Sequence, residues 1–591
     1  MQLPFFTVIL GLCCALSSVT FAADHAPEVA PEVFQAAQTA ATVKPSLRFD
    51  PNKTPAARRS ASAQALSMQY ALPALTDSEQ QALRTTGNTT DKTLKTGLKV
   101  GLGRALPSAL SSKVDLTQWT WQSVDGGQVA HFTLSSSGAE RVRLQVQIGA
   151  LPTGVELRFY APNDTSTVFQ ADLTAQSTFW SPTVSGDSLS VEVFLPATVQ
   201  ASEVELSFVQ LSHFVLDPAA AVLKSSATST ADYSTCQVDL ACASSEWQAT
   251  GKAVARYVFT DTDGYSYLCS GTLLADSDSS TQIPYFFTAA HCVSNATAAS
   301  TMEMFWLYAN STCGGNDASA VQTTGGAQLL VTKPALDTTL VRLNTDPPTG
   351  VTMAGWTTTP LSAGQTVTGI HHGLGYPKKY ASGAFNTRVS VSSEAGGYVV
   401  TPDSNGSFSQ VVWNTGITAP GSSGSGVFVV KNGVHYLNGS LLGGSSECTA
   451  TSAPDEYSRF ELVYPDISAW LWTTTPSFRL FGEGVAPNAL VDGVVISRYL
   501  QGMRGSALTN GVTTQAVDNT VLEMQLAKIQ AIMDVDQDGK TDASKDAQLL
   551  MRYLLGLRQS ALVSGLDFTG SGRKDAVSIT TYLDSVVYST K

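Results

Sequence analysis

Three short segments in the central part of the chain contain residue types that can together catalyse acyl transfer. His291 lies in the segment TAAHC, Asp337 begins an apolar run, and Ser423 lies in the glycine-rich segment GSSGSG. A serine hydroxyl is a weak nucleophile until a neighbouring base takes its proton, and imidazole does this well near neutral pH. A carboxylate orients that imidazole and stabilises its charged form. These residues predict a catalytic triad, and the glycines around the serine let backbone N–H groups approach the developing oxyanion.

Other interpretations of these segments stay open at this point. A single histidine is more often structural, and a Gly/Ser-rich run is more often a plain turn. An esterase would share the triad but would normally place its serine on a strand-to-helix elbow. The residues that follow GSSGSG, Val427–Val430, have the pattern of a strand, which disfavours the esterase.

A second set of residues near the C-terminus could bind a metal ion. From Asp534 to Asp546, carboxylates occupy loop positions 1, 3, 5, 9 and 13, and Gly539 is at position 6. Calcium prefers six to eight oxygen ligands, and this glycine allows the turn that points them inward. We expect one structural Ca²⁺ site and a weaker one near Asp567, with a solvated acidic loop as the alternative; catalysis itself would need no cofactor. The predicted ligands are Asp534, Asp536, Asp538, Lys540, Asp542 and Asp546.

The composition limits the classes of protein that the chain can belong to. Its 591 residues suffice for roughly three to five domains. With 43% hydrophobic and 14% charged residues, the chain as a whole is not disordered. Its net charge of -13 leaves no basic surface of the kind that binds nucleic acid, so we expect no nucleic-acid partner.

The N-terminus has the pattern of a secretory signal peptide. The apolar run Phe5–Ala15 is followed by small residues and by Thr20–Ala22, which resembles a cleavage site after Ala22. No later segment contains the roughly 18 consecutive apolar residues of a membrane helix. We therefore expect a secreted protein without a membrane span, although a buried N-terminal helix is the alternative.

Cysteine usage agrees with export. Two of the eight cysteines lie in the signal run, and the other six fall within the central stretch. An even number in an exported chain suggests three disulfides, whereas a zinc site lacks the C-x₂-C spacing and a histidine cluster. Spacing alone cannot choose among the 15 pairings that six cysteines allow. The six are Cys236, Cys242, Cys269, Cys292, Cys313 and Cys448.

The pattern of residues divides the chain into four parts. After the signal peptide (1–22), residues 23–224 form a predicted pro-region, weakly structured or partly helical up to about 113. From 114 to 216 this region is rich in period-2 runs, which predict an antiparallel β-sandwich. Residues 225–475 again show short strands. Residues 476–591 are helical and contain a duplicated unit, because segments that begin at Asp492 and Asp546 share RYL, G, R and SAL at a spacing of 54.

The central motifs resemble those of the chymotrypsin-like serine proteases, and among them the secreted bacterial lysyl endopeptidases. His291, Asp337 and Ser423 match the catalytic residues of that family, whose domain is a double antiparallel β-barrel. The resemblance also implies that the backbone N–H groups of Gly421 and Ser423 form the oxyanion hole. By this resemblance the disulfides are Cys236–Cys448, Cys242–Cys313 and Cys269–Cys292. The segments that carry it are TAAHC at Thr288–Cys292, a Cys-x₅-Cys at Cys236–Cys242, NSTC at Asn310–Cys313, APGSSGS at Ala419–Ser425 and GGxSxC at Gly443–Cys448.

Two positions depart from the familiar patterns. Ser422 precedes the nucleophile where the pancreatic enzymes have an aspartate, so activation by insertion of a new N-terminus is not expected. The segment from Asp455 to Arg459 resembles the D-x-Y-G-R segment that supplies the acid of the lysine pocket, although a surface-turn carboxylate is the alternative. Leu442 replaces a histidine of the relatives. The resemblance therefore implies cleavage after lysine or arginine.

The resemblance also implies a precursor and partners. Lys224 is the only Lys or Arg between Arg158 and Lys252 and lies in a small-residue linker, so we expect self-cleavage after it. The substrates would be proteins or peptides. The C-terminal module resembles EF-hand and type I dockerin repeats, which implies a cohesin-like or cell-surface partner. A different class, an inactive protease-like adhesion or scaffold protein anchored by this module, is the main alternative.

Overall fold

The computed structural model describes twelve parts of the chain. The predicted signal peptide with Ala22 and the processing site Lys224 lie outside them. Within the described parts, no helix combines the length and the apolar character needed to cross a membrane. The described residues are 27–35, 68–84, 97–164, 167–171, 178–217, 235–277, 282–394, 397–472, 478–481, 487–513, 517 and 519–587.

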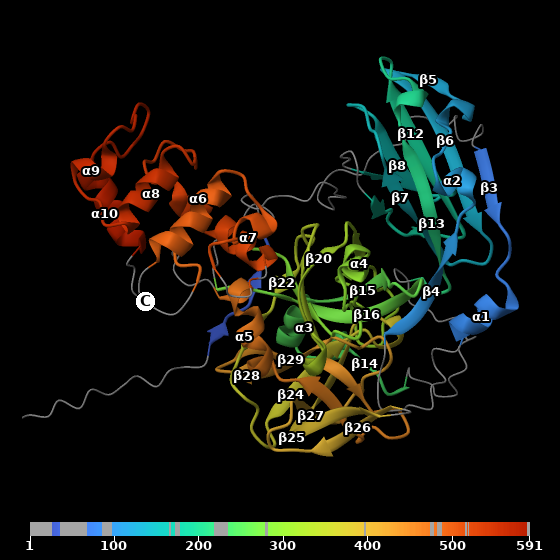
Figure 1. Cartoon of the computed structure of the whole chain (residues 1–591). Helices are drawn as coiled ribbons and strands as arrows, with labels where there is room; N and C mark the ends of the chain where they lie inside the picture. Colours follow the sequence, from blue (N-terminus) through green and yellow to red (C-terminus); the bar gives the residue numbers. More distant parts are fainter. Residues whose placement is uncertain are drawn as a thin grey trace, which may run out of the picture.

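The second half of the central domain is a closed barrel of six antiparallel strands (Figure 1). In the order given below, each strand pairs with the next one, and the pairing of the last strand with the first closes the ring. Apolar side chains that alternate along the strands fill its interior. In ring order the strands are β24 (Thr366–His371), β25 (Lys379–Glu394), β27 (Phe408–Thr415), β30 (Asp455–Ser458), β29 (Val434–Gly444) and β28 (Gly426–Lys431).

The first half of this domain is a sheet curved into a half-barrel. A large apolar cluster joins it to the second barrel and to the closing helix α5 (Phe460–Leu471). This arrangement confirms the mainly β, trypsin-like double-barrel prediction. Its strands are β15 (Val254–Thr260), β16 (Tyr265–Leu274), β17 (Tyr285–Thr288), β18 (Glu303–Trp306), β19 (Val321–Thr323), β20 (Ala327–Lys333) and β21 (Thr338–Leu343), with short helices α3 (Ser245–Gly251) and α4 (Ala296–Ser300).

Two sheets that enclose one apolar cluster precede this domain. The first contains β3 (Met68–Leu72), β5 (Gln122–Val124), β6 (Gly127–Ser136), β8 (Glu156–Tyr160), β9 (Phe169–Gln170) and β12 (Ser188–Pro196). The second contains β4 (Leu98–Ala105), β7 (Arg141–Ile148), β10 (Thr178–Trp180), β11 (Val184–Ser185) and β13 (Leu206–Phe214). Helices α1 (Asp77–Arg84) and α2 (Ser108–Ser111) flank β4 along the chain.

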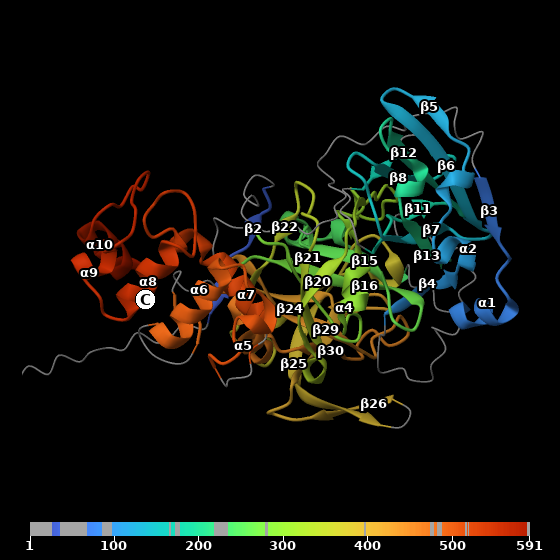
Figure 2. The ribbon, with the colours of Figure 1, turned by 45° about the horizontal axis from the view of Figure 1, so that its top comes forward.

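The second of these sheets continues directly into the half-barrel. Strand β4 pairs with β13 on one side and with β16 on the other, so one twelve-stranded sheet spans both regions. Figures 1 and 2 show the two regions side by side along this strand. Gly101 allows β4 to lie close to β13, because a Cβ there would lie 2.5 Å from the carbonyl oxygen of His213 on that strand.

Part of the N-terminal segment that we expected to be weakly structured is also built into the fold. Strands β1 (Glu28–Val29) and β2 (Glu32–Val33) pair with β23 (Gly355–Thr357) and β22 (Thr352–Met353). Phe34 is buried in the core of the central domain, and Glu28 forms an ion pair with Lys431. The helix α1 agrees with the partly helical alternative. The expectation was wrong for these residues and for β3 and β4, because their partners lie far along the chain and local composition carries no signal of them.

The C-terminal region is a small group of helices around its own apolar cluster. The two copies of the sequence repeat have equivalent contacts: Arg498 and Arg552 each donate to carbonyls after the helix, and Arg504 and Arg558 each stack on the tyrosine of their own copy. The helices are η10 (Ala489–Gly493), α6 (Val494–Leu500), η11 (Gly505–Ala507), α7 (Asn519–Lys528), η12 (Gln530–Met533), α8 (Asp546–Leu554), α9 (Ser560–Val563) and α10 (Ala576–Val587).

Candidate active site

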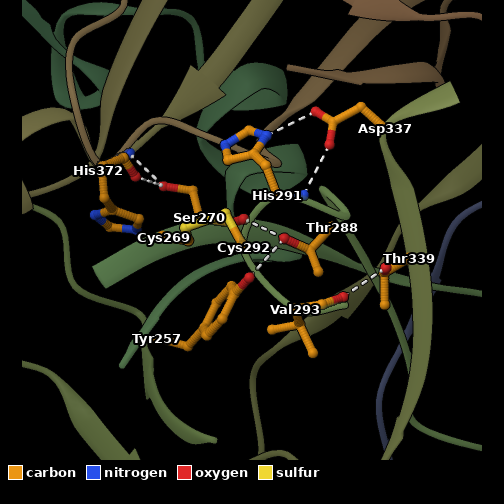
Figure 3. Close-up of a disulfide and its surroundings, with 11 residues drawn as sticks. Tyr257, Cys269, Ser270, Thr288, His291, Cys292, Val293, Asp337, Thr339 and His372 are labelled. Carbon is orange, nitrogen blue, oxygen red and sulfur yellow. Dashed lines mark hydrogen bonds and ion pairs between the residues drawn. A yellow bond between two sulfur atoms is a disulfide. The ribbon is translucent and has the colours of Figure 1, made fainter. Parts of the chain in front are cut away.

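His291 and Asp337 form a two-point contact at the edge of the half-barrel (Figure 3). The His291 backbone N–H donates to Asp337 Oδ1, and its ring Nδ1 donates to Oδ2, both at 2.8 Å. Asp337 is buried and has a φ of 47°, a left-handed conformation that ends a short helical turn (Pro334–Leu336) before β21. Because Nδ1–H points to the carboxylate, Nε2 is left as the basic nitrogen of the ring.

Contacts with strands of the half-barrel fix the segment that contains His291. Thr288 ends β17, donates its hydroxyl to the carbonyl of Ser270 at 2.9 Å and bonds to the Tyr257 hydroxyl at 2.8 Å. Burial raises the pKa of Tyr257, so its phenol stays neutral. Figure 3 shows the Cys269–Cys292 disulfide directly beside this network. The His291 ring is thus fixed by elements that precede and follow it.

Ser423 lies in the turn before β28 and is fully buried. The N–H of Ser270 donates to the carbonyl of Ser423 at 2.9 Å, so the serine turn lies against β16, the strand that contains Cys269. The Cys269–Cys292 disulfide links this strand to the residue directly after His291. The next residue, Gly424, has a φ of 79°, and a Cβ there would lie 2.6 Å from the carbonyl of Ser270. A glycine is therefore required after the serine. Within the described chain, the N–H of Gly421 has no hydrogen-bond acceptor.

Asp455 is fully buried at the start of β30, which excludes the surface-turn alternative. Its Oδ2 accepts hydrogen bonds of 2.7 Å from Trp413 Nε1, Thr418 Oγ1 and Ser446 Oγ, and its Oδ1 accepts one of 3.2 Å from the Ser446 N–H. Neutral donors of this kind favour the ionised carboxylate without cancelling its charge. Thr418, which donates its hydroxyl to this carboxylate, lies five residues before Ser423, so the hydrogen bond ties Asp455 to the segment that leads into the serine turn.

Sequence reasoning missed the three side chains that hold Asp455. Trp413 lies on β27, and Thr418 and Ser446 lie in loops that the barrel brings together. Only the closed barrel makes them neighbours, so no local pattern could have revealed the set. The three disulfides, in contrast, are those that the resemblance implied: Cys236–Cys448, Cys242–Cys313 and Cys269–Cys292.

The C-terminal loop brings together only part of the predicted calcium ligands. Carboxylate oxygens of Asp534, Asp536 and Asp538 lie within 4.8 Å of one another. Asp542 instead accepts from the N–H of Lys545 at 2.7 Å. Lys540 is not part of the carboxylate cluster formed by the described residues. Its backbone N–H donates a hydrogen bond to Asp538.

Asp546 is used by the backbone of the loop. Its carboxylate accepts from the N–H groups of Val535 at 2.7 Å and Asp542 at 2.9 Å, and burial raises its pKa to about 6. Asp492, at the equivalent place of the first repeat, likewise accepts from backbone N–H groups. The last acid of the predicted loop therefore caps the loop backbone in both copies.

A lysine side chain lies inside the carboxylate cluster. Lys545 Nζ is 2.6 Å from Asp536 Oδ2 and 2.9 Å from Asp538 Oδ2, and these hydrogen bonds raise its pKa above the usual range. Asp536 is fully buried, and its Oδ1 has no hydrogen-bond partner among the described residues. The cluster attracts a cation, and the orphaned oxygen is a donor that a divalent ion could use.

The double barrel, the His291–Asp337 pair and the glycine-flanked serine define the protein as a serine endopeptidase of the chymotrypsin fold. The model of the lysyl endopeptidase N-terminal domain matches residues 71–215, and that of the lysyl endopeptidase C-terminal domain matches residues 230–458. A lysyl endopeptidase from Pseudomonas aeruginosa is 34% identical over 378 residues, which are 61% of this chain and 78% of that protein. The chain belongs to the lysyl endopeptidase family.

Solved protease structures were also compared with the chain. An active-form protease from M. tuberculosis is 13% identical to the chain. The matched region covers 37% of this chain and 81% of that protease, with a TM-score of 0.25. A thermostable serine protease from an extremophilic microorganism is 15% identical and covers 36% of this chain and 93% of that structure, with a TM-score of 0.23.

Proposed function

We propose that this protein is a secreted endopeptidase that cleaves after lysine and arginine, with Ser423 as nucleophile, His291 as base and Asp337 as orienting acid. The observation that carries the specificity is Asp455, a buried carboxylate that accepts hydrogen bonds from the neutral side chains of Trp413, Thr418 and Ser446. Thr418 lies five residues before Ser423, on the segment that leads into the serine turn. A cationic side chain of the substrate would form a charge-assisted pair with it. A lysyl endopeptidase among the relatives supports the same preference.

In the proposed catalytic steps, His291 acts through the ring nitrogen that Asp337 leaves unused: among the described residues, His291 Nε2 has no hydrogen-bond partner. His291 Nε2 takes the proton of Ser423 Oγ as the oxygen attacks the scissile carbonyl carbon, and the Gly421 and Ser423 N–H groups stabilise the oxyanion. Asp337, fixed on Nδ1 and on the backbone, stabilises the imidazolium. The imidazolium then protonates the leaving amine, and water hydrolyses the acyl-enzyme by the same route.

Amide substrates that differ only at P1 test this proposal. The mature enzyme should hydrolyse lysyl and arginyl p-nitroanilides at least a hundredfold faster, in kcat/KM, than leucyl or glutamyl ones. Equal rates on all four would contradict the role of Asp455. Absence of hydrolysis of every amide and protein substrate would instead favour the inactive scaffold protein.

We further propose that residues 23–224 keep the enzyme latent by docking on the half-barrel. Strand β4 adds to β16, with Leu98 paired to Leu268, directly before the disulfide-bonded Cys269. A Cβ at Gly97 would lie 3.0 Å from Cys269 Sγ, so the pro-region reaches the immediate neighbourhood of the active site. An edge strand paired in this way is not available to a substrate chain.

A buried arginine strengthens this docking. Arg143 of β7 donates to the carbonyl of Thr301 at 2.7 Å and to Thr260 Oγ1 at 2.8 Å, and it lies 3.9 Å from Glu303 Oε2. Arg143 and Glu303 are both fully buried at the junction. Separation of the two regions would expose this pair, so the pro-region should remain bound until its chain is cut.

Cleavage after Lys224 is the proposed maturation step, for which a signal peptide ending at Ala22 would first direct export. Lys224→Gln should leave the precursor uncut, whereas Lys224→Arg, which keeps a cationic P1 residue, should mature normally. Sequencing of the secreted enzyme should show a chain that starts at Ser225. A start elsewhere, or maturation of the glutamine variant at the wild-type rate, would contradict self-processing.

The C-terminal module is proposed to bind one Ca²⁺ through Asp534, Asp536 and Asp538. Support comes from the orphaned Asp536 Oδ1 and from Lys545, whose ammonium stands in for a cation between two of the carboxylates. The ion would displace this side chain and order the loop before α8. The role of the ion would be structural, as in EF-hand and dockerin repeats, and remote from the chemistry.

A further inference from the structure

The turn that carries Ser423 is hydrogen bonded to the loop between β24 and β25 at successive positions. The N–H of Leu374 donates to the carbonyl of Pro420 at 2.6 Å. The N–H of His372 donates to Ser270 Oγ at 3.1 Å, and this hydroxyl donates to the carbonyl of Gly421 at 2.8 Å. Figure 3 shows Ser270 between His372 and the disulfide. The two peptide units before Ser422 are therefore oriented by their carbonyl oxygens.

A side-chain pair completes this set of contacts. Ser422 Oγ lies 2.8 Å from His371 Nδ1 and accepts from the N–H of Ala419 at 3.0 Å. His371 Nδ1 also accepts from the N–H of Gly373 at 3.2 Å, so this nitrogen carries no proton and the Ser422 hydroxyl must donate to it. Both side chains are fully buried. The direction of every hydrogen bond in the pair is thus determined.

The loop that supplies these partners is itself held rigidly. The buried guanidinium of Arg256 donates to the carbonyl of Gly375 and stacks on Tyr308, 3.7 Å from the ring centre. Leu374, a residue with a side chain, has a φ of 56°, a conformation that persists only where the surroundings impose it. Burial keeps the pKa of His372 well below its usual range, so that ring stays neutral.

We propose that His371 and Ser422 are positioning residues that hold the oxyanion-hole turn in its working conformation. The inference rests on the proposed role of Ser423 as the nucleophile. Ser422 occupies the place where an acid would otherwise pair with a newly freed N-terminus, and its partner is a histidine from the same barrel. Since both residues lie after the predicted processing site, their hydrogen bond exists before and after maturation. The oxyanion hole is therefore already formed in the precursor, whose latency comes from occlusion alone.

The experiment compares four variants of the mature enzyme by kcat and KM on a lysyl amide. Ser422→Ala and His371→Ala should each lower kcat by about 10- to 100-fold with KM within about threefold, because the affected N–H groups act mainly on the transition state. The double variant should lose no more than either single one, since both remove the same hydrogen bond. His371→Asn, whose amide oxygen can accept in place of Nδ1, should recover most of the rate. Ser425→Ala is the matched control and should keep kcat.

A binding measurement separates positioning from mere stability. Affinity for a peptide aldehyde ending in lysine, which forms an oxyanion on Ser423, should fall by the same factor as kcat. Affinity for the corresponding product peptide should not change. Rates of Ser422→Ala equal to those of Ser425→Ala, or additive losses in the double variant, would overturn the inference. If His371→Ala does not accumulate as folded protein, the kcat values of Ser422→Ala and His371→Asn test the inference in its place. Activity in Ser423→Ala would overturn the proposed nucleophile instead.

Discussion

Two acidic sites in this molecule, the single buried carboxylate of Asp455 and the carboxylate cluster of the C-terminal loop, have their negative charge stabilised in opposite ways. In the protease domain, Asp455 is surrounded by one indole, two hydroxyls and one backbone N–H. In the C-terminal loop, Asp536 and Asp538 bind the ammonium group of Lys545 from the same chain. The first cluster stabilises an anion without neutralising it, and the second holds a cation within the fold.

The difference indicates what each cluster can do. Neutral donors leave the field of Asp455 available to a cation that arrives with the substrate, which is what a specificity pocket needs. In the loop, an ion from solution must compete with Lys545, so binding of that ion can only adjust the stability of the module. Four predictions follow from this contrast, ordered from the largest expected effect to the smallest.

The largest effect is expected from removal of the nucleophile. Ser423→Ala should lower kcat by several orders of magnitude, leaving only the residual rate that binding and the oxyanion hole provide. The folded precursor should still be secreted, and its response to Ca²⁺ should match that of the wild type. Activity within about tenfold of the wild type would refute the assignment and make Ser425 the candidate.

The second prediction concerns the pocket. Asp455→Ser should lower kcat/KM for lysyl and arginyl amides by about 10²- to 10³-fold, because the substrate cation would be desolvated without a partner. Hydrolysis of leucyl amides should fall by less than about threefold, which serves as the internal control. A variant that keeps its preference for basic residues would place the pocket acid elsewhere.

These two sites show how far the sequence could predict the structure. The triad candidates, the oxyanion glycine and Asp455 all lie in short contiguous motifs, so family resemblance located them together with the three disulfides. Trp413, Ser446 and His371 come from separate strands and loops that meet only in the closed barrel, and no local pattern marks them. The same applies to β1 and β4, whose hydrogen-bond partners lie more than 100 residues away.

The calcium loop shows a different limit. Spacing alone predicted Asp546 as a ligand, yet the structure uses its carboxylate for backbone N–H groups in the same way as Asp492. The internal repeat contained this information, because both copies keep the aspartate although only one keeps the other acids. An acid that persists without the rest of the ligand set is more simply explained as a cap of the loop.

A third buried polar cluster, in the pro-region, contains a histidine beside an arginine. His213 of β13 bonds to Ser136 Oγ at 2.8 Å, and Arg104 of β4 donates to the same oxygen. Burial, and then Arg104, lower the pKa of His213 to about 4, whereas the unfolded chain has a value near 6.5. The histidine therefore contributes stability above pH 6.5 that is lost as the pH falls toward 4.

Unfolding by urea tests this cluster in the full-length Ser423→Ala precursor. The free energy of unfolding of the pro-region should fall by about 2 kcal/mol between pH 7.5 and pH 5, because the unfolded state takes up a proton that the folded state excludes. His213→Gln, which has no titratable ring, should remove most of this slope. An unchanged slope in that variant would assign the pH dependence to other groups.

The smallest effect is expected from Ca²⁺. The ion should raise the melting temperature of the C-terminal transition in the Ser423→Ala chain by a few degrees, equivalent to roughly 1–2 kcal/mol, and EDTA should reverse the change. Lys545→Gln removes the competing ammonium and should increase the response, whereas Lys540→Gln removes the same charge from outside the cluster and should not. A melting temperature that does not change with Ca²⁺ in any of the three proteins would contradict the proposed calcium site and indicate that Lys545 is the only cation that the cluster binds.

The most direct test of the central claim is a map of the bonds that the mature enzyme cleaves in a denatured protein, read by mass spectrometry with the Ser423→Ala protein as blank. Since we propose the buried Asp455 as the acid of the substrate pocket, the new C-termini should be lysine or arginine almost without exception. The Asp455→Ser variant should lose this bias. Cleavage by the wild type after neutral or acidic residues at comparable frequency would contradict the account.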